Sequence, residues 1–256
     1  MSCFLTSLTP AYAEVLPEML ENHSLRDLYM APMASLYNPH QKTWNVAGLS
    51  IMGVGIAGSL ILHQTADKHF PNSTRNSFYP NMSSRISDIG LFLPLATTSA
   101  FFLSTPLKKE NDPAKQYTFD TAMELLESQT LTGLTSIALK YGVGRTRPDQ
   151  SNAHSFPSFH TSLAFATAGT LMYRYPWYVG VGAMSAATLI GFSRMDLNKH
   201  YSSDVLAGAA LGLLFSTGVQ GLHRAREHQK HGPLKNLTFS PLMENGLYGV
   251  TFSTQL

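Results

Sequence analysis

Long apolar stretches separated by short polar connectors organise most of the chain. Six such stretches follow one another, and each has the length of a helix. They cover residues 44–64, 89–107, 119–140, 158–173, 177–192 and 205–223. Only Tyr175-Pro176, a dipeptide that ends a helix, separates the fourth stretch from the fifth. The pattern predicts an all-α fold, a six-helix bundle.

The connectors between these stretches differ in composition. Residues 65–88 are rich in Asn, Ser and Pro and are predicted to form a polar loop, and residues 108–115 form a charged connector. Pro94 is expected to break the second apolar stretch, because proline inside a helix removes a backbone hydrogen bond. The third stretch carries three acids that a lipid-facing helix rarely tolerates, so we expect it to have one wet face. These acids are Asp120, Glu124 and Glu127.

The beginning of the chain differs from its centre. Residues 1–13 are largely apolar and end in Ala11-Tyr12-Ala13, which resembles a signal-peptidase site behind a shortened leader without basic residues. The alternative is a frayed terminus. Residues 14–43 form a polar arm with the spacing of one or two short amphipathic helices. The helical domain is placed at residues 44–225.

The tail, residues 226–256, alternates apolar with polar or small residues in two short segments. Asn245-Gly246 stands between them, and this dipeptide favours the two-residue turn of a β-hairpin. The sequence therefore predicts a small C-terminal β-hairpin that includes residues 237–239 and 248–252.

Composition narrows the functional classes. The chain of 256 residues has a formal net charge of +2 and only 13% charged residues, without a run of Lys or Arg, so no nucleic-acid partner is expected. Cys3 is the only cysteine, which excludes an internal disulfide, and the chain lacks the Cys and His spacing of a zinc site. These features leave the oligomeric state open.

Membrane placement has two interpretations. Six apolar segments suit an integral membrane protein, whereas abundant Gly, Ser and Thr and a mean hydropathy of -0.04 suit a soluble or peripheral bundle. With the leader-like start of the chain, we expect an exported protein that is periplasmic or membrane-associated. The integral inner-membrane form is the alternative.

A polar block, residues 193–204, separates the last two apolar stretches. His200 and Asp204 are four residues apart, so a helix that begins near His200 places imidazole and carboxylate on one face. A carboxylate there fixes the tautomer of the ring and leaves the far nitrogen free to attack. Arg194 adds a cation with planar donors suited to a phosphate or a carboxylate. The alternative is a helix start with a solvated histidine.

Two more polar blocks stand at the ends of apolar stretches, and the three blocks follow a family pattern. They are Lys140 with Arg147-Pro148, then Pro157-Ser158-Phe159-His160, then Ser193-Arg194 with His200 and Asp204. The blocks resemble the motifs of the type 2 phosphatidic acid phosphatase and vanadium haloperoxidase superfamily. Its pattern is Lys, six residues, Arg-Pro; then Pro-Ser-Gly-His; then Ser-Arg, five residues, His, three residues, Asp. The resemblance covers about residues 115–225.

This resemblance implies a phosphatase that acts on phosphomonoesters or lipid phosphates. By resemblance, His200 attacks phosphorus to give a phosphohistidine, Asp204 orients it, and His160 protonates the leaving oxygen. The residues expected to hold the phosphate are Lys140, Arg147, Ser158, Phe159 and Arg194. Fixed cations would do what Mg²⁺ does in other phosphoryl-transfer enzymes, so no metal or cofactor is expected.

Ser158 and Phe159 stand at the start of the fourth apolar stretch. Ser158 is expected to cap this helix and to donate to a phosphate oxygen together with the helix amides. Phe159 departs from the family, which has glycine there, because phenylalanine supplies neither the room nor the positive φ that glycine allows. Its amide still donates at an ordinary φ. Its ring is expected to narrow the pocket, change substrate choice or disable the site.

Five other polar residues near the blocks fall outside the family pattern. We interpret Arg145 and Asp149 as solvated loop charges, and Asp196 and Lys199 as turn residues that support the loop. We interpret His154 as a loop histidine with satisfied hydrogen bonds; the alternative is that it lines the entrance of the site.

Three hypotheses from different classes remain. The first is a metal-independent phosphatase with a phosphoester or lipid phosphate as its partner. The second is a vanadate-dependent haloperoxidase, because vanadate mimics the same trigonal bipyramid. The third is a catalytically silent, membrane-associated helical protein, which Phe159 makes conceivable.

Overall fold

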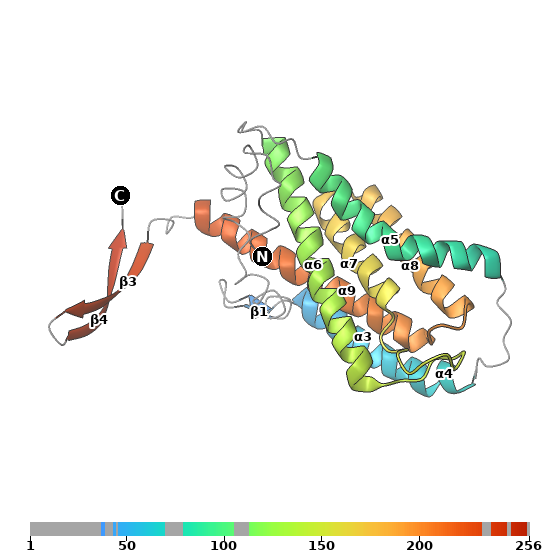
Figure 1. The fold of residues 1–256 in the computed structure, drawn as a ribbon. Helices are drawn as coiled ribbons and strands as arrows, with labels where there is room; N and C mark the ends of the chain where they lie inside the picture. The colour runs from blue at the N-terminus through green and yellow to red at the C-terminus, as the bar shows by residue number, and fades with distance from the viewer. Residues whose placement is uncertain are drawn as a thin grey trace, which may run out of the picture.

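The computed structural model describes residues 37–38, 43–44, 46–69, 79–104, 113–231, 237–244 and 247–254, and its described part is mainly helical (Figure 1). The helices are α3 (Val46–Gln64), α4 (Ala66–His69), α5 (Pro80–Ser104), α6 (Pro113–Val143), α7 (Phe159–Arg174), α8 (Trp177–Asp196) and α9 (Ser202–His231). All six predicted helices are present, and α4 is an additional single turn. The predicted all-α bundle is confirmed.

Short strands lie outside the bundle helices. β1 (Tyr37–Asn38) pairs antiparallel with β2 (Thr43–Trp44), and β3 (Leu237–Glu244) pairs antiparallel with β4 (Leu247–Thr254). The second pair is the predicted C-terminal hairpin. Its turn, Asn245-Gly246, lies outside the described residues, as do the leader-like segment and the helices predicted before residue 37.

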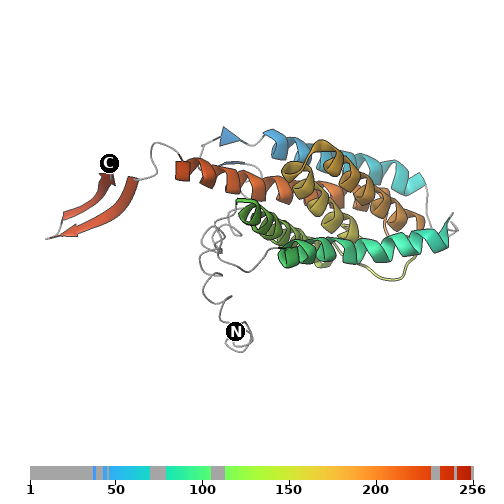
Figure 2. The same ribbon diagram turned by 90° about the horizontal axis from the view of Figure 1, so that it is seen from above.

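Helix α7 lies at the centre of the bundle. It packs against α5, α6, α8 and α9, and α9 in turn packs against α3. The view from above shows α3 on one side of α9 and α5 and α6 on the other (Figure 2). The chain therefore builds two groups of helices around the α7–α9 contact.

Two glycines allow α7 and α9 to touch backbone to backbone. A Cβ on Gly212 would lie 2.3 Å from the carbonyl oxygen of Ser162, and one on Gly208 would lie 2.7 Å from that of Ser158. Because the two glycines are four residues apart, they share one face of α9. This close approach holds the start of α7 against the start of α9, where the polar blocks lie.

The described helices bury small and polar side chains and expose many large apolar ones. Thr121, Ser128, Ser162 and Thr170 are fully buried. Apolar residues such as Val54, Phe92 and Trp177 are 67%, 65% and 75% exposed, which is unusual for a protein surrounded by water. By length and composition, three of the described helices could cross a membrane. They are Val46–Gln64, Asn81–Ser104 and Ser202–Arg224.

The bounds predicted for the polar loop, residues 65–88, are wrong at both ends. α4 begins at Ala66, and α5 begins at Pro80, because proline is tolerated in the first helical turn. The connector predicted at residues 108–115 is also too long, since α6 begins at Pro113.

Pro94 does not break its helix, contrary to expectation. α5 continues through it, and the Pro94 carbonyl accepts hydrogen bonds from the side chains of Thr98 (3.2 Å) and Gln129 of α6 (3.0 Å). The contact with α6 thus supports the helix at the proline. Local helix propensity does not reveal such a contact between helices.

Two of the three acids of α6, Glu124 and Glu127, do not form the predicted wet face, whereas Asp120 is half-buried. Glu124 is 1% exposed and pairs with Arg174, whose Nε donates to Glu124 Oε2 at 2.7 Å. Glu127 is also buried and lies 2.9 Å from Nε2 of His223. These acids face α7 and α9, where buried charges find partners.

Candidate active site

Two loops meet at one end of the bundle. Residues 144–158 join α6 to α7, and residues 197–201 join α8 to α9. The amide of Asp149 donates to the carbonyl of Asn198 (3.1 Å), and Lys199 Nζ lies 2.5 Å from Asp149 Oδ2. Asp149 is therefore part of the link between the loops rather than a solvated charge. Lys199 supports the loop, as predicted.

The end of α8 places His200 beside Arg194. The amides of Lys199 (3.0 Å) and His200 (3.2 Å) both donate to the carbonyl of Arg194, so the chain folds back on the helix end. This turn explains how a spacing of six residues brings the two side chains to one site. Arg194 also donates through Nη1 to Ser87 of α5, and Asp196 accepts from Ser83 Oγ (2.6 Å).

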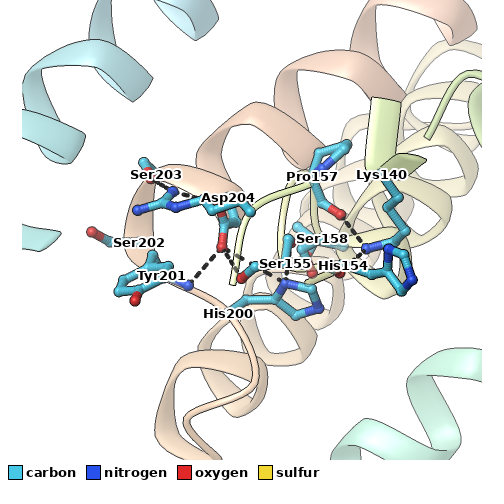
Figure 3. A network of polar contacts seen from close by, with 12 residues as sticks. Lys140, His154, Ser155, Pro157, Ser158, His200, Tyr201, Ser202, Ser203 and Asp204 are labelled. Carbon is cyan, nitrogen blue, oxygen red and sulfur yellow. Dashed lines mark hydrogen bonds and ion pairs between the residues drawn. The ribbon is translucent and has the colours of Figure 1, made fainter. Parts of the chain in front are cut away.

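Asp204 holds the start of α9. The helix begins at Ser202, so His200 precedes it instead of lying within it. Asp204 Oδ2 accepts from the amide of Tyr201 at 2.9 Å, the bond that a carboxylate makes to a helix N-cap residue. Asp204 Oδ2 also accepts from Ser155 Oγ at 2.5 Å, and Figure 3 shows these side chains around His200.

A backbone carbonyl, rather than Asp204, sets the tautomer of His200. Nδ1 lies 2.6 Å from the carbonyl oxygen of Ser155 but 3.9 Å from Asp204 Oδ2, beyond hydrogen-bond distance. A carbonyl only accepts, so Nδ1 carries the proton and the lone pair of Nε2 is available. Burial and the nearby Lys140 and Arg194 lower the pKa of His200 to about 4. The ring is therefore neutral at pH 7.

Lys140, in the last turn of α6, fixes the loop that precedes α7. Its Nζ donates to the carbonyls of His154 (2.9 Å) and Pro157 (2.7 Å), as Figure 3 shows. Burial, followed by the charge of Arg147, lowers the pKa of Lys140 to about 8. Lys140 thus combines a loop contact with a positive charge at the site.

Two arginines each have a buried nitrogen without a hydrogen-bond partner among the described residues. Nε of Arg147 and Nε of Arg194 are buried and have no hydrogen-bond partner in the part of the chain that the structure describes. Burial and the charge of Arg147 lower the pKa of Arg194 to about 10. Buried guanidinium groups that repel one another are stabilised by a bound anion.

His160, in the first turn of α7, completes the group. Burial lowers its pKa to about 3, and Arg194, His200, Lys140 and Arg147 contribute to the shift in that order. His160 thus lies within the electrostatic influence of Lys140, Arg147 and Arg194, and His200 within that of Lys140 and Arg194. The residues matched by the sequence pattern are therefore gathered at one end of the bundle.

Ser158 and Phe159 differ from expectation. Ser158 precedes α7, but its hydroxyl does not cap the helix and instead lies 2.9 Å from Thr161 Oγ1. Phe159 has no positive φ, and its ring edge would lie 3.7 Å from a Cβ on Gly133 of α6. Gly133 is two helical turns from Lys140, so the ring packs between α6 and α7. The helix contact, rather than the site, accommodates the larger side chain.

Sequence reasoning missed three contributors. Ser155 contacts both His200 and Asp204, Ser87 contacts Arg194, and Arg145 donates to Asp204 Oδ1 at 2.6 Å. Arg145 is thus no solvated charge. Ser155 and Ser87 carry no sequence signal, because single serines are common in loops and helices; Arg145 stands two residues before a matched arginine. His154 packs its ring on Tyr141 at 4.9 Å between centroids.

Comparison with known proteins identifies a family for part of the chain. The sequence profile described as the PAP2 superfamily matches residues 121–227. This stretch of the chain belongs to the PAP2 superfamily. The match includes all three polar blocks, so the resemblance inferred from their spacing is confirmed.

Two relatives of this PAP2 stretch are named as lipid A phosphatases. A lipid A 1-phosphatase of Porphyromonas gingivalis is 47% identical over 79 residues, which are 29% of this chain and 18% of that protein. A lipid A 4'-phosphatase of Helicobacter pylori is 31% identical over 128 residues, 49% of this chain and 63% of that protein. The chain thus spans less than two thirds of each relative.

A solved structure supports the PAP2 fold. A transmembrane PAP2-type phosphatidylglycerolphosphate phosphatase from Bacillus subtilis superimposes with a TM-score of 0.52 and 23% sequence identity. The match covers 72% of this chain and 97% of that one. At this identity the likeness concerns the fold alone.

Proposed function

We propose that the chain is a PAP2-type phosphatase that hydrolyses a terminal phosphate from a lipid. The observation that carries the proposal is the pair of buried Nε atoms on Arg147 and Arg194 beside Lys140 and two neutral histidines. An anion with several oxygens compensates these cations, and a phosphomonoester is such an anion.

His200 is the nucleophile in this proposal. Nε2 forms a bond to phosphorus while the bond from phosphorus to the leaving oxygen breaks, which gives a phosphohistidine. Arg147, Arg194 and Lys140 hold the remaining oxygens through the transition state. These fixed cations supply the charge stabilisation that Mg²⁺ provides in other phosphoryl-transfer enzymes. Water then attacks phosphorus, and the bond to Nε2 breaks to release phosphate.

His160 moves the protons. With its pKa at about 3 in the free protein it is neutral. A phosphate dianion nearby cancels the field of the cations and raises this pKa, so the ring takes up a proton as substrate binds. It gives this proton to the leaving oxygen and, neutral again, accepts one from the attacking water.

A lipid substrate is favoured by the surface of the protein and by the relatives. Large apolar side chains are exposed on the described helices, and three of these helices could cross a membrane. The relatives named above are lipid A phosphatases. We infer that the bundle is embedded in a membrane and that its substrate is a phosphorylated lipid.

Phosphate release from a diacylglycerol phosphate in detergent micelles, with EDTA present, tests the proposal. Wild-type protein should release phosphate, and His200→Ala should lower turnover by about 10⁴-fold or more without unfolding the protein. Brief reaction with ³²P-labelled substrate should label wild-type protein covalently, with an acid-labile bond. Unchanged turnover in His200→Ala would rule out the nucleophile, and activity restored only by Mg²⁺ would rule out catalysis by fixed cations alone.

A further inference from the structure

Asp67 lies outside all the sequence motifs, yet it is buried behind the site. Its side chain is 3% exposed although it stands on the single turn α4. It accepts hydrogen bonds from Ser202 Oγ (2.8 Å) and from Ser203 Oγ, the first residues of α9. Arg145 Nη2 lies 3.0 Å from its Oδ2. Asp67 therefore connects the end of α3 and α4 to the start of α9.

Arg145 bridges two buried carboxylates. Nη1 lies 2.6 Å from Asp204 Oδ1 while Nη2 binds Asp67, and the guanidinium group stacks 3.9 Å from the ring centroid of Tyr201. Nη1 also donates to Ser203 Oγ (2.6 Å), and Nη2 lies 3.1 Å from Nδ1 of the exposed His63. These contacts direct Arg145 toward the carboxylates. Arg147 and Arg194 are therefore the arginines that remain to bind phosphate.

The bridge ends at the nucleophile. With Oδ1 held by Arg145, Asp204 uses Oδ2 to accept from Ser155 Oγ and the amide of Tyr201. The carbonyl oxygen of Ser155 in turn accepts a hydrogen bond from Nδ1 of His200. The chain of contacts thus runs from Asp67 through Arg145, Asp204 and Ser155 to His200.

We propose that Asp67 and Arg145 are positioning residues that hold the Asp204–Ser155 pair so that His200 presents Nε2 as a neutral nucleophile. The inference rests on the proposed phosphatase function. Arg145 offsets the charge of Asp204, so this carboxylate favours the protonated form of His200 less than an unpaired carboxylate would. Asp67 fixes Nη2, the second nitrogen of the Arg145 fork. A lysine at this position cannot reproduce the bridge, because its single ammonium group cannot bind two carboxylates with the same geometry.

The bundle supplies a matched control at its other end. Glu124 of α6 is a buried carboxylate paired with Arg174 through two bonds, and Asp67 is likewise a buried carboxylate, paired with Arg145 through one. Glu124 stands sixteen residues before Lys140, about 24 Å along the helix. Glu124→Gln therefore removes a buried ion pair without touching the site.

Steady-state kinetics separate positioning from stability. Asp67→Asn and Arg145→Gln should each lower kcat by about 100-fold at nearly unchanged KM and unchanged orthovanadate affinity, because a misplaced nucleophile slows the chemical step while the phosphate cations remain. Glu124→Gln should lower the melting temperature and keep kcat. The double variant Asp67→Asn/Arg145→Gln should be no slower than Arg145→Gln alone. A kcat loss in Glu124→Gln as large as in Asp67→Asn, or a raised KM with unchanged kcat in Arg145→Gln, would overturn the proposal.

The titration of His200, followed by NMR of ¹⁵N-histidine, does not depend on turnover. Arg145→Gln should raise the pKa of His200, because Asp204 is no longer neutralised, whereas Arg145→Lys should keep most of the charge effect. Asp67, Asp204, Lys140 and Arg194 are the other charged groups, and His63 and His160 the other titratable groups, that face this network or His200. An unchanged pKa in Arg145→Gln refutes the bridge even if the wild type is active. A raised pKa of His200 in Arg145→Gln, together with a wild type that has no phosphatase activity, supports the bridge and refutes the proposed function.

Discussion

His200 and His160 are kept neutral by the same features that prepare the site for an anion. Burial is the main cause of both lowered pKa values, and the cations Lys140 and Arg194 add to it. In the proposed mechanism a neutral His200 attacks phosphorus, while a neutral His160 needs the phosphate before it can act as an acid. The proposed mechanism thus couples binding and proton transfer through charge.

The two histidines also make the stability of the protein depend on pH. Their pKa values are about 4 and about 3 in the folded chain and about 6.5 when unfolded. Between these values the unfolded state binds more protons, so the free energy of unfolding falls as pH falls from about 6.5. The contribution is fully present above pH 6.5. We expect a loss of up to about 1 kcal/mol per pH unit for each histidine.

Chemical denaturation at a series of pH values, in buffer without phosphate, measures this slope. His160→Asn should flatten the curve between about pH 3 and 6.5 and run parallel to wild type above pH 7. Equal slopes in the acid range would show that His160 is not buried among cations as the structure has it.

At the scale of elements, glycines in α9 decide how the loops meet. Gly208 and Gly212 bring the backbone of α9 onto α7, so that the starts of both helices lie together. The amide of Ser158, just before α7, donates to the carbonyl of Asp204 in α9 at 3.0 Å. The second and third sequence blocks are joined through this contact.

Gly212→Ala should weaken the bundle. Its Cβ would lie 2.3 Å from the Ser162 carbonyl, and backbone cannot move aside as a flexible side chain can. We expect a loss of about 1–3 kcal/mol, measured by denaturation in detergent. Gly53→Ala is the control: it has open space around its Cβ and should gain up to about 1 kcal/mol from helix propensity. Equal effects at both positions would contradict the close packing of α7 on α9.

At the scale of the whole molecule, polar and apolar groups are distributed in two ways. The three polar blocks of the sequence lie at the end of the bundle that holds His200, whereas the sides of the described helices expose large apolar residues. The exposed Trp177 and Tyr178 begin α8 at the opposite end from the site, as expected for side chains at a membrane interface. This distribution favours the integral form over the soluble or peripheral bundle.

Extraction of membranes with alkaline carbonate tests this placement. The protein should remain in the membrane pellet, because the exposed apolar faces of α3 and α5 lose their lipid surroundings in water. A peripheral membrane protein in the same preparation, released by carbonate, is the control. Release of this chain into the supernatant would exclude the integral form.

The sequence by itself determined the helices and predicted the chemistry. Apolar stretches of helical length specified α3 and α5–α9, and the fixed spacing of Lys140, Arg147, His160, Arg194 and His200 predicted the phosphate site that we propose. Both signals are local or depend on spacing along the chain, so one sequence suffices to recognise them.

Only the tertiary structure decided which groups touch. It showed that Ser155, not Asp204, accepts Nδ1 of His200, that the Phe159 ring packs toward Gly133, and that Asp67 and Arg145 stand behind Asp204. These contacts join residues from different helices and loops. Side-chain direction across such contacts depends on how the helices pack, and no pattern along the chain encodes it directly.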